Sequence, residues 1–194
     1  VFTAHHIVCD GWSVNIILSD LATHYRMAHE GQPAAQPAAP RFSQYAIAQA
    51  ASKNSQATDL RYWTALFAEL PVLPELPTDR VRPALRSYAG ATYSTRFNAE
   101  LHTSLKKAGA AHGATLFSVL FTALQAVLGR LSGGADIVIG VPAAGQSLDD
   151  EPDLVGHCVH MLPFRVPLAW DAPFAAHIKT VAHLLLDGFD HAKC

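Results

Sequence analysis

The segment AHHIVCDGWS, at residues 4–13, decides how the rest of this sequence is interpreted. It places two adjacent histidines, His5 and His6, shortly before an Asp10-Gly11 pair, which favours a turn. The imidazole of histidine titrates close to neutral pH and can take a proton from an amine, a hydroxyl or a thiol. We therefore expect the functional site in this segment, and its residue types point to acyl transfer.

Hydrophobic spacing predicts the elements on either side of this segment. Residues 1–8 predict a short strand, and residues 14–28 predict a helix with Ser13 as its N-cap and Gly31 as its stop. Four prolines between residues 71 and 83 predict an extended connector. The other predicted elements are helical pieces in 42–70 broken near 53–55, a strand over 91–97, a helix capped by Asn98, a helix over 116–131 between Thr115 and Gly133, strands over 137–139 and 159–166, and a helix opened by Pro173. This order predicts an α/β fold in which helices cover a mixed sheet.

Composition excludes several classes of function. The chain has 194 residues, of which 50% are hydrophobic and 15% charged, as expected for a soluble globular protein. Its formal net charge of -2 gives no electrostatic footprint for nucleic acid or for an anionic membrane. The apolar stretch at 116–131 is too short for a comfortable membrane span. Three cysteines without a Cys-x-x-Cys pair suit a reducing compartment, so we expect a cytoplasmic protein.

The pattern His-His-x-x-x-Asp-Gly, followed by Trp12-Ser13, resembles the active-site signature of condensation domains of nonribosomal peptide synthetases. Chloramphenicol acetyltransferase-like enzymes, wax ester synthases and plant acyltransferases share a similar His-x-x-x-Asp core, so the later segments decide the family. Four of them resemble later blocks of condensation domains in the same order: RFSQYA at 41–46, the stretch from 62 to 83, DIVIGVP at 136–142 and LVGHCVHMLPFR at 154–165.

Three positions depart from the family pattern. Cys158 and His160 stand where a Phe and an Asn are usual, and Gln146 stands where an Arg is common. These departures leave the active-site motif intact. We expect Cys158 and His160 to tune substrate choice rather than to supply chemistry.

The resemblance implies a chloramphenicol acetyltransferase-like fold, an α+β mixed-sheet sandwich of two lobes that meet at a tunnel, present here only in part. Residues 1–76 are then the C-terminal part of the first lobe and residues 77–194 the N-terminal part of the second. Because the tunnel needs both lobes, we expect the isolated 194-residue chain to be inactive.

The resemblance also assigns roles within the motif. If residues 1–8 form a strand, His5 and His6 point to opposite faces. The resemblance selects His6 as the general base or transition-state stabiliser and leaves His5 as a supporting residue. Asp10 completes the set by capping the turn or by pairing with an Arg from the absent part of the domain. Gly11 is predicted to provide a positive φ angle or a close approach of substrate, or simply the turn that starts the helix.

Four further residues are candidates for the wall of the tunnel. Trp12 and Ser13 follow the motif directly, and His157 and His160 belong to the last block. His157 and His160 are three residues apart in a segment predicted to enter a strand. We expect one of these two side chains to face the tunnel and the other to pack.

We expect no metal and no cofactor bound by this chain. Adjacent histidines on a strand cannot chelate one ion together, and the 11 histidines include no His-Glu-x-x-His pattern.

The resemblance implies that peptidyl carrier domains upstream and downstream deliver substrates on phosphopantetheine arms, next to an adenylation domain. The expected reaction is amide formation between two carrier-tethered thioester substrates. Alternatives are a coenzyme A-dependent acyltransferase acting on an alcohol or amine, an epimerisation domain and a catalytically silent docking domain.

Overall fold

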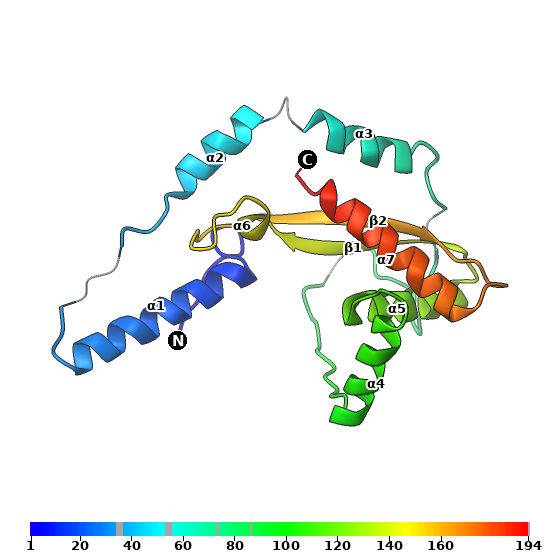
Figure 1. Cartoon of the computed structure of the whole chain (residues 1–194), viewed down its shortest axis with the longest axis horizontal. Helices are drawn as coiled ribbons and strands as arrows, with labels where there is room; N and C mark the ends of the chain where they lie inside the picture. The colour runs from blue at the N-terminus through cyan, green and yellow to red at the C-terminus, as the bar shows by residue number, and fades with distance from the viewer. Residues whose placement is uncertain (34–36, 53–55, 73, 86, 194) are drawn as a thin grey trace. The chain divides into compact units, whose positions relative to one another are not determined.

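A computed structural model describes residues 1–33, 37–52, 56–72, 74–85 and 87–193. Along these residues five helices come first, and two strands, each followed by a helix, come after them (Figure 1). In chain order the elements are α1 (Gly11–His29), α2 (Phe42–Ala51), α3 (Ala57–Leu66), α4 (Ala99–Ala110), α5 (Leu116–Ser132), β1 (Asp136–Ala144), α6 (Gly145–Leu148), β2 (Val159–Pro167) and α7 (Phe174–Asp190).

The chain divides into two compact units that are interleaved along the sequence. The first unit comprises Val1–Ala68, Gly140–Leu162 and Phe189–Cys194, and the second comprises Glu69–Ile139 and Pro163–Gly188. Strands β1 and β2 each contribute residues to both units. The division of the larger domain into lobes at residues 76 and 77 stays a prediction.

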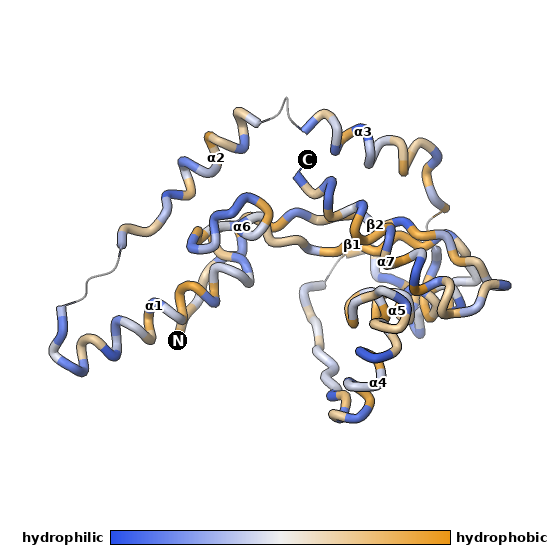
Figure 2. The backbone as a smooth tube through the Cα atoms, viewed as in Figure 1, coloured by the Kyte–Doolittle hydropathy of each residue, from blue (hydrophilic) through white to orange (hydrophobic). Residues whose placement is uncertain are grey.

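Strands β1 and β2 pair in an antiparallel ribbon. Backbone hydrogen bonds close the ribbon at both ends, from Gly145 N to Cys158 O at 2.8 Å and from Leu168 N to Ala135 O at 2.7 Å. Hydrophobic residues run along both strands (Figure 2). In β2 the buried side chains are Leu162, Phe164 and Val166, which alternation places on one face. Val159 and Met161 therefore lie on the opposite face.

Helices α5 and α7 build the core of the second unit. Thr115 caps α5 by accepting a hydrogen bond from Ser118 N at 3.1 Å, and Gly133 ends the helix with a φ of 69°. The Phe121 ring of α5 meets Phe164 of β2 edge to face, with centroids 6.1 Å apart. Gln125 of the same helix donates to Val166 O. The local caps and the apolar face thus set where this helix begins and what it covers.

Two predicted strands are wrong. Residues 1–8 are irregular and end in a turn over residues 6–8, and residues 91–97 are irregular too. An isolated strand leaves its backbone groups without ladder partners, and in the described part of the chain only β1 and β2 pair with each other. The apolar run at 1–8 and the alternation at 91–97 therefore find no partner strand among the described residues.

The predicted helix boundaries lie closer to the observed ones. Asn98 caps α4 through Leu101 N at 2.8 Å, as expected. Helix α1 begins earlier than predicted, because Asp10 rather than Ser13 is its N-cap. The two helical pieces predicted between residues 42 and 70 are α2 and α3. The predicted break at 53–55 lies outside the described residues.

The close contact between α7 and Phe164 predicts that Gly188→Ala destabilises the protein. A Cβ at Gly188 would overlap the Phe164 ring, which is buried and cannot move aside. We expect a loss of at least about 1 kcal/mol in the free energy of unfolding, despite the better helix propensity of alanine. Urea denaturation of the intact protein measures it.

The matched control is Thr180→Ala, at an exposed position of the same helix. It should change stability by no more than about 0.5 kcal/mol. Equal stability of the two variants would show that the space at Gly188 is not restrictive.

Candidate functional site

The carboxylate of Asp10 is the structural centre of the motif. It is only 1% exposed, and it caps α1 by accepting hydrogen bonds from Ser13 N at 2.9 Å and Ser13 Oγ at 2.7 Å. Its other oxygen accepts from Cys158 N at 3.0 Å. Gln146 Nε2 donates to both carboxylate oxygens, at 3.2 and 3.1 Å. The motif is thereby joined to α6 and to the residue that precedes β2.

These hydrogen bonds keep the Asp10 carboxylate charged. Burial alone raises the pKa of a carboxyl group, but hydrogen bonds from the Ser13 and Cys158 amides, the Ser13 hydroxyl and Gln146 lower it. The net result is a pKa of about 2 for Asp10. The predicted pairing of Asp10 with an Arg stays a prediction. All the donors observed here are neutral.

We call the Asp10 carboxylate and its hydrogen-bond partners the anchor. Ser13 connects this anchor to the segment before β2 as well. Gly156 N donates to Ser13 Oγ at 3.0 Å, and Ser13 Oγ lies 2.8 Å from Gly156 O. Since Asp10 holds Cys158 N, the backbone is tied to the start of α1 on both sides of His157. Ser13 is fully buried, so its place is in this anchor and not in a pocket wall.

The anchor brings His157 to His6. The two Nδ1 atoms lie 3.1 Å apart, and the rings meet edge to face with centroids 5.1 Å apart. His5 is engaged locally instead: its Nδ1 accepts from Ile7 N at 3.1 Å, and its carbonyl accepts from Val8 N at 3.0 Å. Because residues 1–8 form no strand, strand alternation does not distinguish the roles of His5 and His6. Their different hydrogen-bond partners distinguish them instead.

His6 and His157 line a pocket of about 480 Å³. Its walls are otherwise mainly apolar, and Asp10 and Gly11 also contribute to it. The remaining lining residues are Trp12, Pro142, Ala143, Ala144, Val159 and Met161. Trp12 is held in place by a hydrogen bond from its Nε1 to Pro152 O at 2.9 Å. A pocket with two imidazoles and mainly apolar walls is able to exchange a proton with a bound molecule.

Gly11 does not have the positive φ angle that was one of its predicted roles. It is the first residue of α1, and the glycines with positive φ in the described residues are Gly31, Gly113 and Gly133. A Cβ at Gly11 would meet nothing within 4 Å. Open space beside this backbone is compatible with the two other roles, an approach of substrate and the turn that starts the helix.

The structure separates His160 from this pocket. By strand alternation His160 shares the face of Leu162, opposite Val159 and Met161, which line the pocket.

Cys158 is buried beside Asp10. Burial first, and the charge of Asp10 second, raise the pKa of its thiol to about 11. A thiol that stays protonated at neutral pH is a poor nucleophile.

Gln146 is the residue of the site whose role the sequence did not show. Its side chain is completely buried on α6, and its Oε1 has no hydrogen-bond partner among the described residues. Turning the amide over would bring Oε1 against the Asp10 carboxylate, which is unfavourable. The signal in the sequence was the departure itself, a Gln where the family commonly has an Arg.

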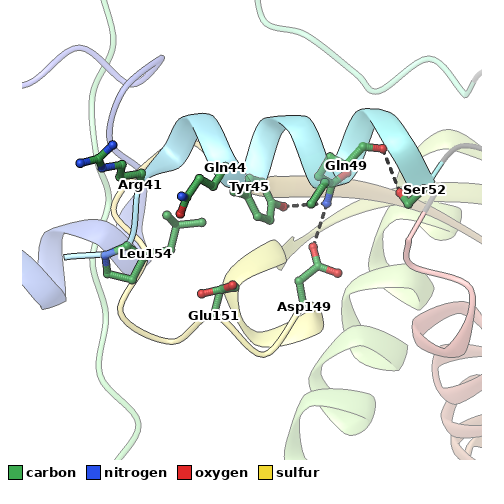
Figure 3. A pocket seen from close by; sticks show the side chains of 10 residues that line it. Arg41, Gln44, Tyr45, Gln49, Ser52, Asp149, Glu151 and Leu154 are labelled. Atoms are coloured by element: carbon green, nitrogen blue, oxygen red, sulfur yellow. Dashed lines mark hydrogen bonds between the residues drawn. The ribbon is translucent and has the colours of Figure 1, made fainter. Parts of the chain in front are cut away.

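A second pocket, of about 410 Å³, lies between α2 and the segment that follows α6 (Figure 3). Gln49 Nε2 donates to Tyr45 Oη at 2.9 Å and to Asp149 Oδ2 at 2.8 Å. Burial, together with the nearby Cys158 and Asp149, raises the pKa of Tyr45. These contacts attach the RFSQYA segment to the segment that carries Gln146. Their evident role is to hold α2 in place.

The described residues contain no group of three or more His, Cys, Asp or Glu side chains placed to hold a metal ion. No described helix is long and apolar enough to cross a membrane.

The fold and the histidine pair define a mixed α/β protein with a pocket lined by two imidazoles at the start of a helix. The family model for the condensation domain matches residues 1–194, so the chain belongs to the condensation-domain family. This confirms the family that the motifs indicated.

Similar proteins include synthetases that are many times longer than this chain. The chain is 37% identical over 194 residues to malpibaldin synthetase of Mortierella alpina. It is 32% identical over 194 residues to one of the subunits of linear gramicidin synthase from Brevibacillus parabrevis. Each alignment covers 98% of this chain and 4% of the relative. The chain thus spans a small part of the relatives it matches.

Solved structures show the same fold. The first condensation domain of the CDA synthetase matches with a TM-score of 0.84 and 27% identity, over 98% of this chain and 42% of that chain. The X-domain from teicoplanin biosynthesis matches with a TM-score of 0.81 and 28% identity, over 98% of this chain and 44% of that chain. These matches confirm the predicted mixed α/β fold and its partial extent.

The low pKa of Asp10 predicts how Asp10→Asn changes stability with pH. A group whose pKa is lower in the folded than in the unfolded protein stabilises the fold above its unfolded pKa, near 4, and loses that effect as the pH falls toward 2. We expect Asp10→Asn to cost about 1–2 kcal/mol at pH 7. Urea denaturation between pH 2 and pH 7 measures the difference, which should shrink below pH 4.

Asp20→Asn, at an exposed position of the same helix, is the control and should change little. If the difference in the free energy of unfolding between wild type and Asp10→Asn stays constant down to pH 2, it does not come from the charge of the Asp10 carboxylate.

The neutral pairing of Gln146 with Asp10 predicts a strong effect of Gln146→Glu. The substitution keeps the shape and puts a second carboxylate against a buried one, so we expect a loss of more than about 2 kcal/mol at pH 7. Part of it should return near pH 4, as the new carboxyl group takes up a proton. Gln146→Met removes the donor without adding charge and should cost about 1 kcal/mol. Thermal unfolding at the two pH values compares them, and equal losses would exclude charge repulsion.

Proposed function

We propose that this chain is the part of a condensation domain that carries its acid-base group, and that the domain forms an amide bond between two carrier-tethered thioester substrates in nonribosomal peptide synthesis. The observation that carries the proposal is the His6 imidazole in a largely apolar pocket, in a chain of this family. Similarity to a dimodular nonribosomal peptide synthase of Bacillus subtilis, 35% identical over 195 residues, supports the peptide product.

The chemistry requires one proton acceptor and good positioning. The amine nitrogen of the downstream substrate attacks the thioester carbonyl carbon of the upstream substrate, and its surplus proton passes to His6. The tetrahedral intermediate then expels the thiolate, which takes up a proton. Because the thioester is already activated, no covalent enzyme intermediate is needed, and holding two tethered arms together lowers much of the barrier. His6 acts as the base or stabilises the charge of the intermediate.

The partners follow from the proposed substrates. Each thioester is attached to a phosphopantetheine arm, so upstream and downstream peptidyl carrier domains must reach the domain, with an adenylation domain nearby to supply the downstream residue. Similarity to multidomain synthetases supports this arrangement. The chain itself is proposed to hold no cofactor.

A docking function is the second candidate, and one observation favours it. The teicoplanin X-domain, which shares this fold, has been solved in complex with OxyB. A docking domain needs its surface and not the imidazole of His6. The two candidates therefore differ in their response to loss of that imidazole.

In the intact protein that contains this chain, His6→Ala should lower the rate of amide formation by roughly 10²-fold or more, the scale of a positioned acid-base group. Single-turnover assays with preloaded carrier domains measure the chemical step, and melting curves exclude misfolding.

His5→Ala is the matched control, because the hydrogen bonds of His5 to other described residues lie within its own turn. It should affect stability more than rate. If a well-folded His6→Ala protein forms the amide at the wild-type rate, His6 has no role in proton transfer. If wild type forms no amide and both variants retain partner binding, the docking function is favoured.

A further inference from the structure

The contact between His6 and His157 places a restriction on both rings. Their Nδ1 atoms are 3.1 Å apart, within hydrogen-bond distance. A neutral imidazole carries one N–H and one bare nitrogen, so one and only one of these two Nδ1 atoms can hold a hydrogen while the contact persists. The contact therefore couples the tautomer of His6 to the presence of His157.

Only one of the two arrangements leaves His6 suited to its proposed role. If His157 donated, the His6 hydrogen would sit on Nε2 and that nitrogen would be unable to accept a proton. If His6 Nδ1–H donates to His157, Nε2 of His6 is bare and available as the base. We infer that His157 is a positioning residue that accepts the Nδ1 hydrogen of His6 and holds His6 in its basic tautomer. This inference rests on the proposed function of His6.

The anchoring of His157 supports a positioning role. Its two neighbours in sequence, Gly156 and Cys158, are bound to Ser13 and Asp10 at the start of α1. His6 lies four residues before Asp10 in the same segment. The buried anchor thus fixes the backbone on both sides of His157. It also fixes Asp10, at the end of the segment that carries His6. A residue that merely lined a tunnel would not require this two-sided attachment.

The same arrangement accommodates the charge that the reaction creates. When Nε2 of His6 takes the proton from the substrate amine, His6 becomes a cation and its Nδ1–H still points to the bare Nδ1 of neutral His157. A hydrogen bond from a charged donor is stronger than one from a neutral donor, so the contact tightens as the proton arrives. His157 receives no proton in this step, and the proton on Nε2 remains available to the departing thiolate.

The test compares two substitutions at His157 in the intact protein. His157→Asn places an amide oxygen close to the position of Nδ1, where it can accept the same hydrogen bond, whereas His157→Phe keeps a ring and removes the acceptor. We expect His157→Phe to lower kcat by about tenfold with KM for both carrier-bound substrates unchanged, and His157→Asn to stay within about threefold of wild type. If the phenylalanine variant does not fold, His157→Ala replaces it.

A second readout follows the His6 ring without requiring activity. Mass spectrometry measures the exchange of the C2 hydrogen of His6 with deuterium at a fixed pH, and this rate depends on the state of the two ring nitrogens. We expect it to change by at least about twofold in His157→Phe and to stay near wild type in His157→Asn.

The combined outcomes separate this inference from the proposed function. Equal exchange and equal kcat in the two variants would overturn the positioning role. A change in KM or in substrate ranking alone would make His157 a wall residue and overturn it too. Altered exchange in His157→Phe, in a protein whose wild type forms no amide, would support the contact while removing the proposed function.

Discussion

The buried carboxylate of Asp10 is the interaction on which the candidate site depends. It caps α1, holds the amide of Cys158 and receives the side-chain amide of Gln146. A carboxylate removed from water is costly unless its oxygens are bonded, and these contacts supply the bonds. The segment that carries His6 and the loop that carries His157 are therefore tied to each other. The catalytic proposal for His6 requires this attachment, because proton transfer needs a base in a defined place.

The donors around Asp10 are neutral, and this shapes the chemistry nearby. Among the described residues, the hydrogen-bond donors to Asp10 carry no charge, and its negative charge, after burial, raises the pKa of the adjacent Cys158 thiol. The buried Oε1 of Gln146 carries no hydrogen bond among the described residues, which is the cost of directing both amide hydrogens to acceptors.

The antiparallel ribbon explains why two distant sequence blocks belong together. DIVIGVP lies in β1, and LVGHCVHMLPFR lies in β2 and the irregular segment directly before it. Pairing of these strands brings Ala143 and Ala144 to the pocket that Val159 and Met161 also line. Residues 1–8 and 91–97 have the composition of strands and remain irregular, since a strand is stabilised by its neighbour and composition does not supply one.

Local interactions determined what the sequence could predict by itself. Helix caps such as Asn98 and Thr115 bind amides three residues away, and the alternation of β2 decides which face each side chain occupies, so these features follow from neighbouring residues. The motif around His6 is also made of neighbouring residues, so it indicated the family and the expected reaction type. The anchor and the histidine pair were decided only by the tertiary structure. Gln146 and His157 reach Asp10 and His6 from 136 and 151 residues along the chain. No local pattern encodes which distant donor will meet a buried carboxylate, because that depends on how the strands pair and where α1 packs.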